Sequence, residues 1–452
     1  MIGSMSLSQV SSVTNGVRQG DDVQFARVST DTRTLQQGDL YVALRGENFD
    51  GNEFVTQAFE RGACAAVVSS ALDSEHPGVR VADTTVALGE IARLNRQASN
   101  ARVIAITGSQ GKTTVKEMIA AILGVGNRVL MTRGNLNNHI GVPLTLLALD
   151  ASHECAVIEL GASGLGEIAY TVRLVMPHIA VLTNAAATHI AGFGDLAGVV
   201  RTKGEIIDGL LEGGIAVLNA DDEHFAQWQA RAAGKRVLSF GLGDTADYRA
   251  SGIRLLESGR SLFTLHTPVG ETQIQLALAG THNVRNALAA AAAAMAAGAD
   301  LAQVQEGLGQ LAPVPGRLNW LLSAGGARLI DDSYNASPAS FRAAIDVLAA
   351  LPGRRLLIVG DMGEMGEQSE SAHVELGAYA REKGLDALWA TGTFSALSAG
   401  SFGAGGRHFA TQETLIAEAK KTLSENDVVL VKGSRSAAME RVIAQLKNGD
   451  TE

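Results

Sequence analysis

The chain has 452 residues, which is enough for about three domains of average size. Its composition, with 46% hydrophobic and 19% charged residues, is typical of a globular protein with large buried cores. The formal net charge of −10 argues against the phosphate backbone of a nucleic acid as a partner.

The sequence also argues against export and membrane insertion. Met1–Gln9 contains no basic segment and no long apolar run, so we expect no signal peptide and a cytoplasmic protein. The most apolar segment, Ala287–Ala299, is too short to span a bilayer and predicts a packed helix rich in alanine. Cys64 and Cys155 lie in apolar, strand-like runs, which predicts two reduced core residues.

The first 82 residues alternate the signals of strands and helices. Asp39–Leu44 and Ala65–Ser69 predict strands, and Gly51–Arg61 between them predicts a helix. Val28–Arg33 carries hydroxyl, acidic and arginine side chains at the end of another strand. This cluster fits a polar ligand, although a solvated turn is the more ordinary explanation.

A strand, a glycine loop and the start of a helix follow one another within Arg102–Ala121. Val103–Ile106 predicts a buried strand, Gly108 and Gly111 permit a tight loop, and the residues from Thr113 onward have helical spacing. In such an arrangement, backbone N–H groups and the helix N-terminus hold a phosphate. The pattern therefore predicts a phosphate-binding loop (P-loop).

Two side chains of this loop carry the chemistry. Lys112 is placed to reach the terminal phosphates of a nucleotide, and a threonine hydroxyl directly after it is placed to bind Mg²⁺. Ile106 replaces the first glycine of the common pattern, so this is the shorter form Thr-Gly-x-x-Gly-Lys-Thr. A glycine-rich turn with an exposed lysine is the alternative, which the agreement of strand, loop and helix disfavours.

Two polar features follow the P-loop helix. Gly134–Pro143 is rich in Asn and Gly and fits either a simple turn or a polar ligand. Cys155–Gly161 predicts a strand that contains Glu159, and a carboxylate in an apolar strand is costly unless it is paired or binds a metal. In P-loop proteins a second strand commonly ends in an acid that serves Mg²⁺, which favours that role over a structural ion pair.

The remaining elements continue the α/β pattern. Further strands and helices predict a mostly parallel sheet covered on both faces: His178–Asn184, Val199–Ile207 and Gly214–Asn219. Residues 237–278, together with the strand Arg236–Phe240, predict a small antiparallel addition. Pro313–Arg317 predicts a linker. After it, strands restart with polar residues at the ends of Arg355–Gly360 and Asp427–Val431, where ligands of open α/β sheets gather.

Several motifs together resemble the Mur ligases, ATP-dependent amide-forming ligases of peptidoglycan precursor synthesis. They occur in the order and spacing of that family and cover essentially the whole chain: Thr107–Thr114, Val157–Glu159, Asn184 to His189, Lys203–Glu205, Gly280–Asn286 and Gly316–Arg317. Within the family, four further loops resemble the member that adds D-alanyl-D-alanine to UDP-N-acetylmuramoyl-tripeptide: Asn135–Pro143, Asp331–Pro338, Gly360–Glu367 and Val431–Ser436.

The resemblance implies an α/β protein of three domains. Residues 1–82 would form an N-terminal α/β domain that binds the uridine diphosphate end of the substrate. Residues 83–313 would form a central P-loop ATPase domain with a mostly parallel sheet. Residues 314–452 would form a C-terminal Rossmann-like ligase domain that closes over the site and brings the dipeptide. The two substrates would be the only partners of a monomer.

The resemblance also implies roles for individual residues. Lys112, Glu159, His189, Lys203 and Arg317 would be catalytic. The nucleotide would be bound by the P-loop and by residues beyond it: Gly108, Ser109, Gln110, Gly111, Thr113, Thr114, Asn283, Asn286, Arg317 and Asp332. Mg²⁺ would be held by Thr113, Glu159, His189 and a carbamylated Lys203. The nucleotide-peptide substrate would meet Ser29, Asp31, Arg33, Asn137 and Asn138.

A carbamate supplies the oxygen ligands that Mg²⁺ prefers, whereas a free ammonium would repel the ion. Only a neutral amine reacts with CO₂, so Lys203 is expected where its charged form is disfavoured. The implied reaction forms an acyl phosphate on the tripeptide and then an amide. Two alternatives stay open, a ligase of the same superfamily with another acceptor and a non-catalytic nucleotide switch. Amine-dependent phosphate release would distinguish them.

Overall fold

The computed structural model describes residues 1–46, 48–73, 75–186, 190–256, 259–311, 316–363 and 365–447, with only the backbone of 190 and 191. The chain divides into two compact units. The first unit is Met1–Tyr248 with Ala289–Gly307, and the second is Arg249–Leu288 with Leu308–Glu452. Each unit is described by itself below.

The first unit begins with a small α/β layer. A five-stranded sheet has the order β2-β7-β6-β5-β4, in which only β2 runs antiparallel to its neighbour. Its elements, with the pair β1-β3 beside it, are β1 Met5–Ser6, α1 Leu7–Thr14, β2 Val17–Gln19, β3 Gln24–Phe25, β4 Val28–Ser29, β5 Leu40–Val42, η1 Gly51–Phe54, α2 Val55–Glu60, β6 Ala65–Val68 and β7 Gly78–Arg80.

Helix α3 (Thr84–Gln97) connects this layer to the central sheet. Its N-terminus is capped by Asp83, whose carboxylate accepts from the N–H groups of Thr85 and Val86. Buried Asn95 donates hydrogen bonds to the backbone carbonyls of Leu146, in helix α5 (Gly141–Leu147), and of Leu149, two residues after that helix. One core cluster runs from the N-terminal layer through α3 into the central sheet, which makes the two layers one unit.

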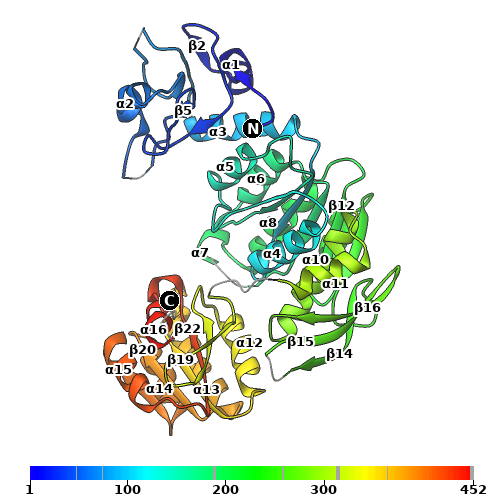
Figure 1. Ribbon diagram of the computed structural model, residues 1–452, viewed down its shortest axis with the longest axis vertical. Helices are drawn as coiled ribbons and strands as arrows, with labels where there is room; N and C mark the ends of the chain where they lie inside the picture. The colour runs from blue at the N-terminus through cyan, green and yellow to red at the C-terminus, as the bar shows by residue number, and fades with distance from the viewer. Residues whose placement is uncertain are drawn as a thin grey trace. The chain divides into compact units, whose positions relative to one another are not determined.

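The central sheet has six parallel strands in the order β13-β12-β11-β8-β10-β9. Helix α4 packs on β8, β9 and β10, and α8 packs on β11 and β8 (Figure 1). The elements are β8 Arg102–Thr107, α4 Lys112–Gly124, β9 Val129–Met131, α5 Gly141–Leu147, β10 Cys155–Glu159, α6 Glu167–Val175, β11 Ile179–Leu182, α7 Ile190–Phe193, α8 Leu196–Asp208, β12 Ile215–Asn219, α9 Phe225–Arg231 and β13 Arg236–Phe240.

The second unit contains two sheets. Three antiparallel strands, β14 Arg249–Leu255, β15 Ser261–Thr267 and β16 Gly270–Leu276, form one of them. The other has the order β17-β18-β22-β19-β20-β21 and is parallel except for β17. Its elements are β17 Asn319–Leu322, β18 Arg328–Asp332, α12 Pro338–Ala349, β19 Arg354–Val359, η2 Gly366–Gln368, α13 Ser369–Glu382, β20 Ala387–Thr391, α14 Ser395–Phe402, β21 Gly406–Phe409, α15 Gln412–Thr422, β22 Asp427–Lys432, η3 Arg435–Ala437 and α16 Glu440–Leu446.

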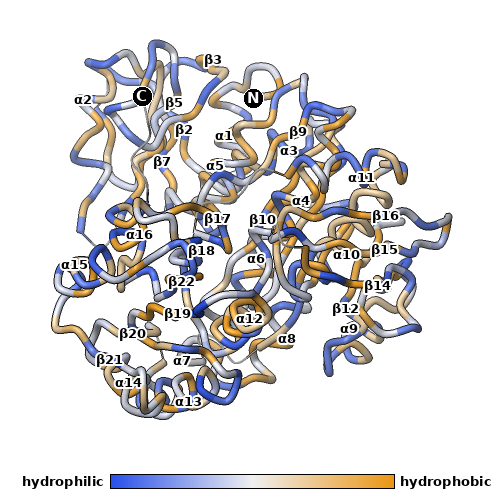
Figure 2. The backbone as a smooth tube through the Cα atoms, turned by 60° about the horizontal axis from the view of Figure 1, so that its bottom comes forward, coloured by the Kyte–Doolittle hydropathy of each residue, from blue (hydrophilic) through white to orange (hydrophobic). Residues whose placement is uncertain are grey.

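Helices α10 (Thr281–Ala296) and α11 (Leu301–Gly309) lie in sequence between these sheets. The predicted alanine-rich helix is confirmed as part of α10, and Ala287 and Ala289 to Ala294 are almost completely buried. Apolar stretches of the chain are short and interrupted by polar ones (Figure 2). None of the helices in the described ranges is long and apolar enough to cross a membrane.

The structure confirms the α/β class and the parallel central sheet, and it corrects three details. Arg236–Phe240 is not part of the antiparallel addition, because it pairs in parallel with β12 at the edge of the central sheet. Gly51–Arg61 is a 3₁₀ turn followed by α2. Cys155 is buried and free as predicted, whereas Cys64 is also free but only partly buried, and it packs against the core cluster from outside.

Candidate active site

The P-loop is shaped by two glycines with positive φ. Gly108 has φ +148° and Gly111 has φ +80°, and α4 begins directly after them. A Cβ atom on Gly108 would lie 2.0 Å from Oγ1 of Thr183, at the end of the neighbouring strand β11. Only glycine fits that position, so the close approach of the two strand ends requires this residue.

The segment after β11 holds the loop from its other side. The N–H of Ser109 donates to the backbone carbonyl of Asn184 at 3.0 Å, and the N–H of Gln110 donates to Oδ1 of the same residue, also at 3.0 Å. The hydroxyl of Thr183 donates to the carbonyl of Gln110 at 2.6 Å. These contacts fix the loop backbone, and sequence reasoning did not assign Thr183 to the site.

Lys112 lies over the loop that precedes it. Its Nζ donates to the carbonyl of Gly108 at 2.7 Å and to the carbonyl of Ser109 at 3.3 Å. Thr113 and Thr114 occupy the next two positions of α4, and Thr114 is 7% exposed. The ammonium is therefore positioned at the helix N-terminus, where both the lysine and the helix dipole favour an anion.

Glu159 reaches the same edge of the sheet because β10 pairs with β8, with Glu159 opposite Ile106. The residue is 2% exposed, and its Oε1 accepts a hydrogen bond from Nδ2 of Asn137 at 2.9 Å. Its Oε2 is buried and has no hydrogen-bond partner within the described residues. A buried carboxylate oxygen without a partner is costly, and a cation would remove that cost.

Two residues that sequence reasoning missed position Glu159. Its N–H donates to Oγ1 of Thr132 at 2.9 Å, and Nζ of Lys116 donates to the carbonyl of Thr132 at 2.8 Å. Lys116 is 1% exposed and also pairs with Glu117 at 3.0 Å. The sequence signal that could have identified Lys116 is its position in the P-loop helix, directly beside the apolar residue Val115.

Lys203, in α8, is the second buried lysine near the P-loop. It is 2% exposed, its Nζ lies 5.2 Å from the ring centroid of Phe193, and it donates to the carbonyl of Ala162 at 3.4 Å. Burial, followed by repulsion from Lys112, lowers the pKa of Lys203 to about 7. The charged form of Lys203 is therefore disfavoured by its surroundings, in agreement with the expectation from the sequence.

The structure does not test the complete predicted metal set. His189 lies outside the described residues. Among the residues that are described, no group of three or more His, Cys, Asp and Glu is placed to hold a metal ion. Thr113, Glu159 and Lys203 lie around the P-loop edge, and the unpartnered Oε2 of Glu159 is the feature in this part of the chain that fits a hard cation.

The predicted substrate residues have local partners. Arg33 is exposed and forms a two-point ion pair with Asp31, which lowers the pKa of Asp31 to about 2. The hydroxyl of Ser29 donates to the carbonyl of Asp31. Asn137 holds Glu159 as described above, and Oδ1 of Asn138 accepts from the N–H of Gly141 at 2.8 Å. Asn138 therefore shapes the start of α5.

The remaining predicted nucleotide residues lie in the second unit. Asn283 is buried at the start of α10, where its Nδ2 donates to the carbonyl of Ala279, and its Oδ1 accepts from Nδ2 of Asn286 at 3.2 Å. The guanidinium of Arg317 lies 4.5 Å from the ring centroid of Tyr334. Asp332, at the end of β18, completes this set and is described further below.

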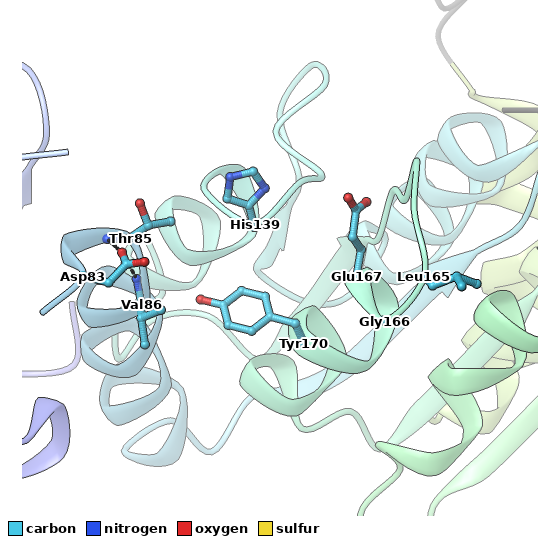
Figure 3. A pocket seen from close by; sticks show the side chains of 8 residues that line it. All are labelled: Asp83, Thr85, Val86, His139, Leu165, Gly166, Glu167 and Tyr170. Atoms are coloured by element: carbon cyan, nitrogen blue, oxygen red, sulfur yellow. Dashed lines mark hydrogen bonds between the residues drawn. The ribbon is translucent and has the colours of Figure 1, made fainter. Parts of the chain in front are cut away.

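A pocket of about 480 Å³ lies in the first unit, where it is lined by residues of α3 and α6 and by His139. Tyr170 and Glu167 project into it from α6, opposite the start of α3 and below His139 (Figure 3). The N–H of Ser163 donates to Oε2 of Glu167 at 2.8 Å, and the carbonyl of the preceding residue, Ala162, accepts from Lys203. The turn before α6 thus lines the pocket with Leu165 and Gly166 and contacts Lys203 through the carbonyl of Ala162.

A parallel sheet with a glycine loop after one strand and a buried acid at the end of the next defines a P-loop nucleotide-binding protein. Family models agree and are more specific. They match the Mur ligase family, catalytic domain, over residues 24–120, the Mur ligase middle domain over 106–294, and the Mur ligase, glutamate ligase domain, over 316–435.

Individual relatives cover the whole chain. The sequence is 47% identical over 451 residues to UDP-N-acetylmuramoyl-tripeptide–D-alanyl-D-alanine ligase of Escherichia coli (strain K12), with 99% of each chain covered. A crystal structure of MurF from Acinetobacter baumannii matches with a TM-score of 0.92 at 38% identity, covering 98% of this chain and 99% of that one. MurF ligase from Thermotoga maritima, solved in complex with ADP, matches with a TM-score of 0.84 at 29% identity and covers 93% and 96%. The chain belongs to the Mur ligase family.

Proposed function

We propose that this chain is an ATP-dependent, ADP-forming ligase that joins D-alanyl-D-alanine to the tripeptide carboxylate of UDP-N-acetylmuramoyl-tripeptide. The observation that carries this function is the 47% identity, over 99% of both chains, to the relative of that name. The reaction is a step of peptidoglycan precursor synthesis and so serves cell wall biogenesis, cell shape and cell division. The enzyme acts as a cytoplasmic monomer.

ATP is bound by the P-loop. The N-terminus of α4 faces the phosphates, and the ammonium of Lys112, which lies over the loop carbonyls, binds the β- and γ-phosphates. Asn283 and Asn286 contact the nucleotide, Arg317 its phosphates and Asp332 its ribose. The ADP complex of the Thermotoga maritima relative supports nucleotide binding by this fold.

Mg²⁺ fits the carboxyl edge of the central sheet. The buried, unpartnered Oε2 of Glu159 supports this assignment, since a hard cation satisfies such an oxygen. Thr113 would supply a hydroxyl to this ion, and His189 and carbamylated Lys203 would hold a second one. When bound, the metal neutralises the negative charge that collects on the phosphates during transfer.

Lys203 becomes carbamylated through its neutral form. Its neutral amine nitrogen attacks the carbon of CO₂, a C–N bond forms as one C=O π bond opens onto oxygen, and one proton leaves to solvent, so that the neutral side chain becomes an anionic carbamate. The pKa of about 7 supports this step, because an ordinary lysine is almost fully protonated at pH 7. The anion also removes the repulsion between Lys203 and Lys112.

The chemistry has two steps. The tripeptide carboxylate attacks the γ-phosphorus and displaces ADP, giving an acyl phosphate. The free amine of D-alanyl-D-alanine then attacks the acyl carbon, phosphate leaves, and the amine loses a proton. Because the protein forms no covalent bond to the substrates, its contribution is orientation and the stabilisation of charge by Lys112 and Arg317.

The test is phosphate release by the purified chain with Mg-ATP and UDP-N-acetylmuramoyl-tripeptide, with and without D-alanyl-D-alanine. Release that needs both substrates, with a product heavier by the dipeptide, is expected. Stimulation by a different amine alone would keep the family assignment and reject this acceptor. Absence of release with any amine would reject a catalytic role.

A further inference from the structure

Lys432 is a buried lysine in the second unit that the proposed reaction does not use. It is the last residue of β22, it is 3% exposed, and its register partner on β18 is Asp332. Its Nζ lies 2.6 Å from Oδ2 of Asp332 and 2.9 Å from the carbonyl of Asn335. One ammonium therefore holds both the end of a strand and the loop after it.

Asp332, in addition to its contact with Lys432, binds the segment that contains Arg317. Its Oδ1 accepts a hydrogen bond from the N–H of Leu318 at 3.2 Å, and Leu318 has φ +51°, a conformation that non-glycine residues seldom adopt. The N–H of Tyr334 donates to the carbonyl of Gly316 at 3.1 Å. The two segments 316–318 and 332–335 are thus joined, and Asp332 lies at their junction.

The start of α10 is also affected by Lys432. Burial, followed by the charge of Lys432, lowers the pKa of His282 to about 4. His282 is therefore neutral at pH 7. It directly precedes Asn283, so the charge of Lys432 is felt at the start of α10.

We propose that Lys432 is a positioning residue for the nucleotide, which orients Asp332 towards the ribose and fixes the backbone next to Arg317. This inference rests on the proposed function, in which Asp332 and Arg317 contact ATP. Within the described part of the chain, each carboxylate oxygen of Asp332 accepts one hydrogen bond and has a further lone pair, so a ribose hydroxyl can donate to it.

A purely structural ion pair would behave differently, and the same strand provides a matched control. Asp427 is the first residue of β22, is 1% exposed, and pairs with Arg354 at 2.9 Å at the opposite edge of the sheet. Asp427→Asn removes a buried charge from the same strand without touching a candidate nucleotide residue. Lys432→Met is the variant under test. Asp427→Asn and Lys432→Met are both expected to lower thermal stability, but only Lys432→Met should change nucleotide binding.

The experiment compares the full chain with its Lys432→Met, Asp332→Asn, double and Asp427→Asn variants. The KM and kcat are measured for ATP and for 2′,3′-dideoxy-ATP, and the Kd for ADP is measured by calorimetry. Lys432→Met should raise the KM for ATP and the Kd for ADP about tenfold while kcat changes less, the size expected for one lost hydrogen bond to a charged group. It should also remove the preference for ATP over the dideoxy analogue.

The double variant should be no worse than Asp332→Asn, because Lys432 acts through that residue. If Lys432→Met does not fold, Lys432→Gln, which keeps one donor group, takes its place, and Lys432→Arg should restore part of the preference. An unchanged KM and ribose preference, with a loss of stability like that of Asp427→Asn, would overturn the proposal. Wild-type activity with D-alanyl-D-alanine in the same assay shows that such a result leaves the proposed function intact.

Discussion

Lys203 and Lys432 are both almost completely buried, yet their surroundings differ. Lys432 is 2.6 Å from a carboxylate oxygen and also donates to a carbonyl. Among the described residues no carboxylate forms an ion pair with Lys203, which donates to a carbonyl at 3.4 Å. A paired ammonium can organise loops as a fixed charge. An unpaired one tends to lose its proton, and the neutral amine is the reactive form.

The largest effect is expected at a third lysine, Lys112, which is only partly buried and lies over the P-loop. Lys112→Ala should lower kcat for phosphate release by at least about 1,000-fold, because it removes the cation that meets the transferred phosphate. The exposed Lys447→Ala is the control and should keep wild-type activity. A variant of Lys112 that retained a tenth of the activity would reject the P-loop assignment.

The second largest effect is expected at Lys203, and it tests whether Lys203 acts as a reactive amine while Lys432 acts as a fixed cation. Lys203→Ala should reduce kcat by about 100-fold or more, and short carboxylic acids such as acetate should restore part of it by replacing the carbamate oxygens. The same acids should have no effect on Lys432→Met, because there the lost group is a cation. Equal rescue of both variants, or full activity of Lys203→Ala, would remove the distinction.

The same substitution should change stability in opposite directions at the two sites. Lys432→Met leaves the partly buried carboxylate of Asp332, which is 13% exposed, without its cation and should lower the free energy of unfolding by up to about 3 kcal/mol. Lys203→Met replaces an unpaired buried amine by an apolar side chain and should raise it, by on the order of 1 kcal/mol or more. Denaturant titrations at pH 7 in CO₂-free buffer measure both values, and destabilisation at both sites would contradict the comparison.

The smallest expected effect is the change with pH in the stability difference between Lys203→Met and the wild type. The pKa of Lys203 is about 7 in the folded chain and about 10.5 when the side chain is free, so between these values the unfolded chain carries more protons. The contribution of Lys203 to the free energy of unfolding therefore rises with pH across that window. The advantage of Lys203→Met over the wild type should shrink from pH 7 to pH 10. Melting temperatures of both proteins at the two pH values check this, and a constant difference would place the pKa of Lys203 near its ordinary value.

Local patterns in the sequence were enough to predict the P-loop, the buried strands and Glu159, because glycine spacing and apolar runs express local geometry. The pattern did not predict the partners of these residues. Lys116 contacts Thr132 only once α4 has packed on the central sheet. Lys432 contacts Asp332, 100 positions earlier in the sequence, only once β22 has paired with β18. Such long-range contacts depend on sheet register, which no short motif specifies.

The misplacement of Arg236–Phe240 has a similar cause. Its alternation of exposed and buried positions is typical of any edge strand, whether parallel or antiparallel. What decides its partner is β12, which offers a free parallel edge before the chain enters the antiparallel strands. For the substrate residues, Asp31 and Arg33 were identified as a polar cluster, but their mutual ion pair follows from the turn that joins them.

The position of β22 has a consequence for biosynthesis. This strand is the last of its sheet in the sequence, yet it lies in the interior of the sheet between β18 and β19. During translation, β18 and β19 are made about 100 and 70 residues earlier and expose unpaired edges until β22 leaves the ribosome. A stop codon anywhere before residue 427 would leave those edges open permanently. Truncated products should therefore be substrates for proteases rather than partly active enzymes.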